Sequence, residues 1–293
     1  MTRTAWLTAS LGFGYLVLGW AAVVSVDFLN VRDAQSWLTA DFHPLPLLWY
    51  ELFSEASPAE NLQWAALATA FLAMATVAWR LRQADSRPAY PLCAVLAIGL
   101  LLMLVEDSLN LRHIVVDHYF PTLFGDDDTY PRSLYRLIWE LMFYSLLAAL
   151  MALPFLAFWR SRAWEGTGLK LLVFAYAIYG FAGFSSAMRR IGDWQERLGQ
   201  HIIARFKLSE LPAWTEALER MERAREQSEN YTHTLGYLLT DHLIEESIEL
   251  IATTLLVTGL LCVRRNMLQK CGDLGHPHIS YLADRPLQRR PFS

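Results

Sequence analysis

Hydrophobic residues come in long blocks along this chain rather than in short amphipathic stretches. Predominantly apolar runs extend over about residues 5–26, 62–79, 90–110, 134–159, 169–188 and 236–263. A helix needs about 20 apolar residues to cross the roughly 30 Å hydrocarbon core of a bilayer. Each run is close to this length, and the pattern therefore predicts six transmembrane helices.

The composition agrees with this pattern. Of the 293 residues, 54% are hydrophobic and only 18% are charged, which is too apolar for an ordinary soluble domain. Soluble enzyme folds and nucleic-acid-binding modules are therefore disfavoured. We expect an all-α, polytopic integral membrane protein with about six transmembrane helices and an extracytoplasmic helical cap. The lipid bilayer is its expected environment, and a small-molecule or protein partner is not identified by the sequence.

The distribution of charge predicts the orientation in the membrane. If the N-terminus is cytoplasmic and each run crosses once, the cytoplasmic side carries a net charge of +9. The remaining residues carry −13, and the two values give the chain's net charge of −4. Cytoplasmic loops of membrane proteins are enriched in Lys and Arg. We therefore expect a multi-pass protein of a bacterial inner membrane with both termini in the cytoplasm.

Two polar segments complete the expected organisation. After the fifth run, Trp194, Leu198 and Ile202 recur at helical spacing, and Pro212 suits the first turn of a second helix. These features predict a helical cap over residues 189–235 on the outer face. A basic cytoplasmic tail is expected over residues 264–293, after a single transmembrane domain of residues 1–263.

Polar residues also occur where lipid should exclude them, at the outward-facing ends of the runs. At the end of the third run, Glu106, Asn110, His113 and Asp117 are separated by four, three and four residues. If one helix continues through this stretch, the four side chains share a face. They would then point toward the same neighbouring helix.

Two other runs carry acidic residues near the same face of the membrane. Glu140 lies in the outer third of the fourth run. The sixth run opens with a polar stretch in which His242, Glu249 and one of the two glutamates between them share a helical face. We therefore expect a candidate site made of Glu106, His113, Asp117, Glu140, His242, Glu245, Glu246 and Glu249.

Three interpretations of these acids stay open. An ionised carboxylate near the bilayer centre costs about 2.5 to 3.5 kcal/mol, so buried acids need compensation. Arginines at positions 112, 136, 189 and 190 would supply it in a structural network of ion pairs. Alternatively, the acids and imidazoles bind a divalent metal ion (Fe, Mn or Zn), as carboxylates from facing helices do in helical bundles. Acids with a histidine also suit proton or cation transport.

Two acidic stretches of the chain resemble segments of other bacterial membrane proteins. The segments EDSLNLRH (residues 106–113) and EESIE (residues 245–249) are similar to those of a group of bacterial multi-span membrane proteins. The resemblance covers the third to the sixth run and implies no particular activity. This chain departs from it by placing Arg112 beside His113.

The preferred functional hypothesis is a membrane protein with a metal-binding acidic and histidine-containing site in the outer half of the bilayer. Such a site would suit an oxidoreductase or a hydrolase working at the outer leaflet. The alternative is a non-enzymatic transporter or a partner-binding membrane subunit whose acids are structural.

Overall fold

The structure is a computed structural model of the whole chain. It describes residues 2–38, 45–84, 89–115, 119, 130–160, 166–188, 193–227 and 234–273. The described residues form helices and short connections, and no strand occurs among them. The predicted all-α fold is confirmed.

Among the described residues, six helical segments are long and apolar enough to cross a membrane, as the hydrophobic runs predict. They are α1 (Arg3–Val23) with the π-helix η1 (Val24–Phe28), α3 (Leu48–Phe53) with α4 (Pro58–Gln83), α5 (Ala89–Leu109), α8 (Tyr130–Arg160), α9 (Thr167–Met188), and α12 (Leu235–Leu238) with the π-helix η5 (Leu239–Glu245) and α13 (Glu246–Asp273). The shorter helices are η2 (Val31–Asp33), α2 (Gln35–Leu38), α6 (Leu111–Ile114), α10 (Trp194–Arg205), η4 (Leu208–Glu210) and α11 (Pro212–Gln227).

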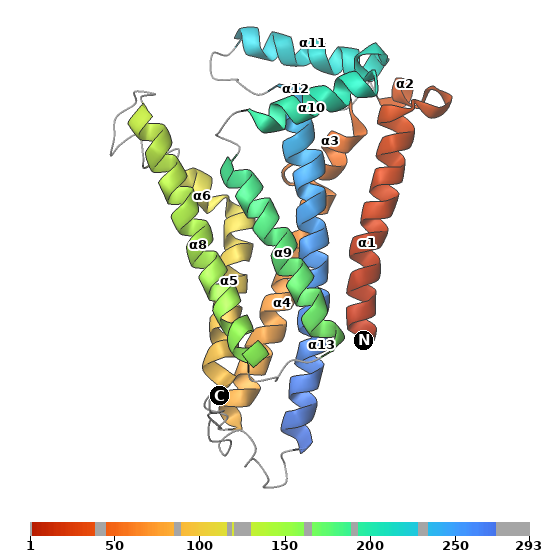
Figure 1. Cartoon of the computed structure of the whole chain (residues 1–293). Coiled ribbons are helices and arrows are strands. Elements are labelled where there is room, and N and C mark those ends of the chain that lie inside the picture. Colours follow the sequence, from red (N-terminus) through yellow and green to blue (C-terminus); the bar gives the residue numbers. More distant parts are fainter. Residues whose placement is uncertain are drawn as a thin grey trace, which may run out of the picture.

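The long helices stand side by side as a bundle, and α10 and α11 lie across one end of it (Figure 1). We call this end the cap end. The α13 helix packs against α1, α4 and α9, while α5 lies between α4 and α8. The last helix extends to Asp273, ten residues beyond the predicted end of the sixth run at 263.

The transmembrane part of the bundle is held by close helix packing. Its buried core joins residues of α4, α5, α9 and α13, among them Met74, Leu96, Leu172 and Leu256. At Gly259 on α13, an added Cβ would lie 3.0 Å from the backbone oxygen of Gly168. Small residues let helix backbones approach closely in membranes, where van der Waals contact replaces the hydrophobic effect as the main attraction.

A second buried cluster lies at the cap end and contains Trp49, Phe53 and Trp214. Its polar centre is Asp27, which is fully buried. The Asp27 carboxylate accepts hydrogen bonds from the backbone N–H groups of Leu48 (3.0 Å) and Trp49 (2.7 Å) at the start of α3. The indole of Trp214 on α11 donates to the carbonyl of Asp27 at 2.6 Å. The end of the first span thus connects α3 to the cap.

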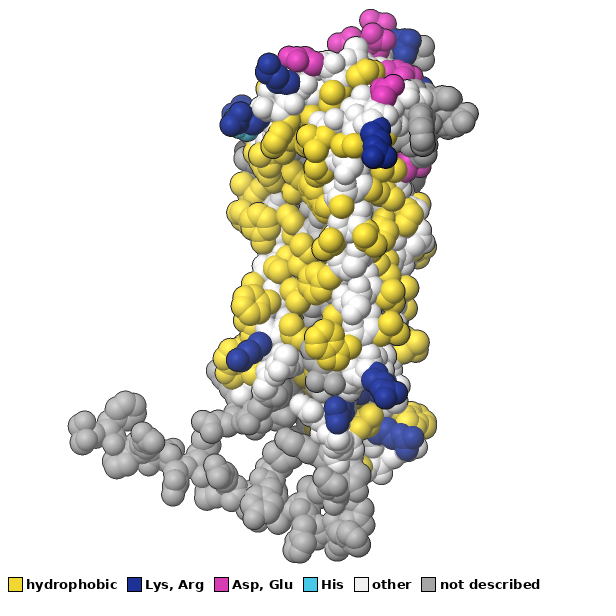
Figure 2. All heavy atoms as spheres, turned by 90° about the vertical axis from the view of Figure 1, so that its right-hand side faces the viewer, with side chains coloured by type: hydrophobic (Ala, Val, Ile, Leu, Met, Phe, Trp, Pro, Cys, Tyr) yellow, Lys and Arg dark blue, Asp and Glu magenta, His cyan; other side chains and the backbone are white. Residues whose placement is uncertain are grey.

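The surface has the character expected of a membrane protein. On the face that it displays, Figure 2 shows hydrophobic side chains spread broadly over the middle of the molecule. Val17 and Leu18 on α1, for example, are 68% and 72% exposed. On the face that Figure 2 displays, acidic side chains appear at the cap end together with Lys and Arg side chains, whereas the charged side chains drawn at the opposite end are Lys and Arg.

Candidate functional site

Carboxylates from three parts of the chain line one small polar cavity at the cap end. Its volume is about 90 Å³, and we call it the acidic cavity. The described residues that line it are Glu55, Glu60, Glu106, Asp107, Asn110, Ser186, Asp241, His242, Glu245, Glu246 and Glu249. Five residues of the predicted site therefore line the acidic cavity. Glu106 comes from α5, and the other four come from the last span: His242, Glu245, Glu246 and Glu249.

The π-helix η5 explains why five residues of the last span reach the same cavity. In a π-helix the backbone bonds run from i to i+5, so each residue turns less than in an α-helix, and residues four and five apart come close to one line. Asp241, His242 and Glu245 lie in η5, and Glu246 and Glu249 follow in the first turn of α13. Single turns of π-helix are frequent at functional sites.

The start of α4 contributes the second group of residues. Ser57 caps this helix, Pro58 follows in the first turn, and Glu60 comes three residues after the cap. The Glu60 carboxylate accepts a hydrogen bond from the backbone N–H of Ala56. One turn further, the side chain of Gln63 donates to the Glu246 carboxylate at 2.9 Å. The capped end of α4 therefore positions two carboxylates, one on its own first turn and one on α13.

The cap helix α10 also contacts the site. Gln195 is buried, and its side chain donates to the Glu245 carboxylate at 2.9 Å. The hydroxyl of Thr240 in η5 donates to the carbonyl of Gln195 at 2.9 Å. His242 packs edge-on against the ring of Tyr50 on α3, with ring centroids 5.7 Å apart. The cap is therefore joined to the acidic cavity by direct hydrogen bonds.

The predicted polar stripe at the end of the third span is wrong in one respect. The α5 helix ends at Leu109, and Asn110 has a left-handed backbone conformation with φ of 50° before α6 begins. A continuous helical face from Glu106 to Asp117 therefore does not form. Glu106 and the adjacent Asp107 still line the acidic cavity. The side chain of His113 and the whole of Asp117 lie outside the described residues.

Glu140 is placed differently from the other predicted residues. It lies on α8 and is 1% exposed. It is not among the described residues that line the acidic cavity, so its participation in the site stays a prediction. The side chains of Arg112 and Arg136 and the residues Arg189 and Arg190 also lie outside the described part, so the ion-pair network stays a prediction too.

The metal-binding prediction is not supported by the present arrangement of side chains. Within the described ranges, no three His, Cys, Asp or Glu side chains come close enough together to hold a metal ion. Among the contacts of Glu245 and Glu246 are hydrogen bonds donated by the neutral amides of Gln195 and Gln63, respectively.

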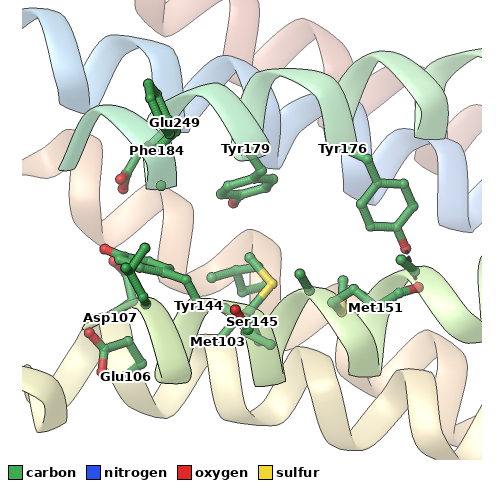
Figure 3. Close-up of a pocket in the computed structure, with 18 of the residues that line it drawn as sticks. Met103, Glu106, Asp107, Tyr144, Ser145, Met151, Tyr176, Tyr179, Phe184 and Glu249 are labelled. Atoms are coloured by element: carbon green, nitrogen blue, oxygen red, sulfur yellow. Dashed lines mark hydrogen bonds between the residues drawn. The ribbon is translucent and has the colours of Figure 1, made fainter. Parts of the chain in front are cut away.

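A larger and mainly apolar cavity adjoins the acidic one. Its volume is about 430 Å³, and we call it the apolar cavity. It lies among α4, α5, α8, α9 and α13, within the spans (Figure 3). Its lining consists of Gln63, Leu67, Met103, Glu106, Asp107, Leu141, Tyr144, Ser145, Leu147, Ala148, Met151, Ala152, Tyr176, Tyr179, Gly180, Ala182, Gly183, Phe184 and Glu249.

The two ends of the apolar cavity differ in chemistry. Figure 3 shows Glu106 and Asp107 at one end and Tyr176 beside Met151 at the other. At that second end, the hydroxyl of Tyr176 on α9 donates to the backbone carbonyl of Met151 on α8 at 3.2 Å, which joins the two helices. Three carboxylates (Glu106, Asp107 and Glu249) line both cavities. The two cavities therefore share one polar boundary.

Sequence reasoning did not place Glu55, Glu60 or the apolar cavity in the site. One local signal was present for Glu60. The segment Ser57-Pro58-Ala59-Glu60 has a capping residue, a proline at the first helical position and a glutamate three residues after the cap, which is typical of a helix start. It places the start of the second span four residues before the predicted residue 62. The apolar cavity has no such local signal.

Comparisons of this chain with protein-family models, with curated proteins and with solved structures give no match.

Proposed function

We propose that this membrane protein binds a lipid-like amphiphile, with the apolar part of the molecule in the apolar cavity and its polar end at the acidic cavity. The observation that carries the proposal is the shared boundary of the two cavities at Glu106, Asp107 and Glu249. An amphiphile matches this arrangement, because it joins an apolar chain to a polar group at one end, as the apolar cavity joins the acidic cavity.

The size and lining of the apolar cavity support this function. Pockets for small ligands are typically about 300 to 1,000 Å³ and are lined mainly by apolar and aromatic side chains with a few polar groups that set the orientation. The volume of about 430 Å³ falls in this range. Leu67, Met103 and Met151 supply apolar surface, and the carboxylates supply the polar end.

Charge distribution supports a location of the binding site in the outer half of the membrane. Arg80 and Arg82 end α4, and Arg264 and Arg265 lie in the last part of α13, at the end of the bundle opposite the cap. Because Lys and Arg are enriched on the cytoplasmic side of membrane proteins, we place the cap end outside. The amphiphile would then come from the outer leaflet.

Native mass spectrometry of the purified full-length chain tests the proposal. Gly180 lines the apolar cavity, and a Cβ there would have no heavy atom of the described residues within 4 Å. We expect wild-type protein to carry a bound amphiphile and Gly180→Leu to lose it, since the leucine fills the cavity. Gly14→Leu on α1 is the matched control, because Gly14 has equally open surroundings away from the cavity. Equal occupancy in all three proteins would contradict the proposal.

A divalent metal ion at the acidic cavity is the second candidate. The donor set favours it, because carboxylate oxygens with one imidazole suit Mn, Fe or Zn. Glu60, Glu106, His242, Glu246 and Glu249 would hold the ion after their side chains move inward. Such an ion would supply Lewis-acid or redox chemistry, as a hydrolase or an oxidoreductase needs.

Elemental analysis and chelation test the metal candidate. A bound ion stabilises the folded state, so a chelator should lower the melting temperature of wild-type protein. Glu246→Gln should abolish this effect, whereas Glu210→Gln on the exposed surface of the cap should preserve it. Wild-type protein without metal and without a response to chelator would remove this candidate and, with it, the enzyme hypothesis.

A further inference from the structure

We infer that the ligand of the apolar cavity is a single-chain amphiphile with a cationic, ammonium-type head group that enters sideways from the membrane between α8 and α9. The inference rests on the proposed function and adds the charge of the head group, the length of the chain and the route of entry.

The head-group charge follows from the carboxylates at the boundary of the cavity. Glu106 and Asp107 from α5 and Glu249 from α13 lie at the polar end, and the acidic cavity beyond them adds Glu60 and Glu246. Like charges repel strongly where water is scarce, so a sulfate or phosphate head group is disfavoured there. An ammonium group combines positive charge with several N–H donors and complements this boundary on both counts.

The chain length follows from the distance between the two ends of the cavity. Phe184 lies near the polar end of α9 and Tyr176 lies at the other end, two turns away (Figure 3). A rise of 1.5 Å per residue makes this distance about 12 Å. The hydrogen bond from Tyr176 to the Met151 carbonyl closes that end. The cavity therefore suits one extended alkyl chain of about the length of a decyl group.

The route of entry follows from the exposure of the cavity wall. Leu141 on α8 and Phe184 on α9 line the cavity and are nevertheless 48% and 64% exposed. Gly180 lies one helical turn before Phe184 on α9, is also exposed, and has no side chain that could close the cavity at this point. These positions lie within segments that are apolar enough to cross the membrane, so the opening faces lipid. An amphiphile already in the bilayer can enter there without passing through water.

Binding of three decyl compounds to the full-length chain in lipid nanodiscs tests the inference. Decylamine, decanol and decyl sulfate share a chain and differ in the charge of the head group. We expect decylamine to bind at least tenfold more tightly than decanol, and decyl sulfate to bind most weakly. Gly180→Leu should weaken both the amine and the alcohol, whereas Gly14→Leu should weaken neither.

Variants of the boundary residues separate charge from shape. Glu249→Gln should reduce the preference for the amine over the alcohol by about tenfold and leave decanol binding unchanged. Glu106→Gln on α5 provides the same test if Glu249→Gln does not fold, and Glu210→Gln on the cap surface is the control.

The outcomes distinguish the inference from the proposed function. If the amine and the alcohol bind equally and Gly180→Leu weakens both, the head-group inference is wrong and the proposed function stands. If decyl sulfate binds most tightly, the head-group inference is also wrong. If none of the three binds and Gly180→Leu changes nothing, the proposed function fails as well.

Discussion

Gln63 on α4 donates a hydrogen bond from its side-chain amide to the carboxylate of Glu246 on α13 at 2.9 Å, across a separation of 183 residues. Gln63 is 1% exposed and lines the apolar cavity, while Glu246 lines the acidic cavity. This bond therefore lies at the boundary of the two cavities and holds a carboxylate of the acidic cavity against the wall of the apolar cavity.

Replacing Gln63 with leucine should destabilise the protein. The change removes the donor to a partly buried carboxyl group, and leaving such a group without its hydrogen bond costs about 1 to 3 kcal/mol. Unfolding by titration with sodium dodecyl sulfate measures the loss. Gln200→Leu is the matched control, because Gln200 also donates to a glutamate, Glu196, but on the exposed surface of α10. A loss as small as that of the control would show that the Gln63 bond contributes little.

Replacing Gly199 with alanine should loosen the cap. A Cβ at Gly199 on α10 would lie 1.9 Å from the backbone oxygen of Gly236 in α12, so the two helices must separate. Overpacking of this kind costs about 1 to 3 kcal/mol. Faster cleavage of α10 and α11 in limited proteolysis is the expected result. Gly14→Ala, with open surroundings, should leave the cleavage rate unchanged or lower it.

Gln195 on α10 donates a hydrogen bond to the Glu245 carboxylate, so a displacement of α10 by Gly199→Ala should also displace this carboxylate in the acidic cavity. Weaker binding of decylamine in Gly199→Ala would reveal this coupling. Unchanged binding in a protein with a demonstrably loosened cap would show that the cap and the site are independent.

Replacing Asp27 with alanine should destabilise the connection between the first span and α3. The Asp27 carboxylate accepts from the backbone N–H groups of Leu48 and Trp49, and the change leaves one partly buried and one buried donor without that acceptor. A loss of about 2 to 5 kcal/mol is expected, since each unsatisfied buried group costs about 1 to 3 kcal/mol. Glu222→Ala, at an exposed position in α11, is the control, and the midpoint of unfolding is the quantity measured for both variants.

The proposed orientation can be tested by labelling in intact cells. Cysteines introduced at Glu196 and Glu210 in the cap should react with a membrane-impermeant thiol reagent, whereas one at Asn266, exposed near the opposite end of α13, should not. Lysed cells should label all three positions equally, which controls for reactivity. Labelling of Asn266→Cys alone in intact cells would reverse the orientation.

One feature of the site has a clear signature in the sequence, and two others do not. The start of α4 at Ser57 and Pro58 has a local signature, and it brings Glu60 into the first turn. The end of α5 at Asn110 has only a weak signature, because asparagine tolerates a left-handed conformation but does not require it. The π-helix η5 has none, because no residue type requires a π-turn. A regular helix was therefore the expectation in both places, and it was wrong.

By itself, the sequence determined that the chain spans the membrane about six times and that acidic residues collect near one end of the spans. Both properties depend on residues that are neighbours along the chain: a run of about 20 apolar residues has one stable state in lipid, and its polar residues stay near its ends. The tertiary structure alone decided that Gln63 meets Glu246 and that α8 and α9 leave an apolar cavity beside Glu249. The physical reason is that lipid is as apolar as the helices, so hydrophobicity does not select which helix faces meet. Close packing of small residues and hydrogen bonds between distant segments select them, and these exist only in the folded bundle.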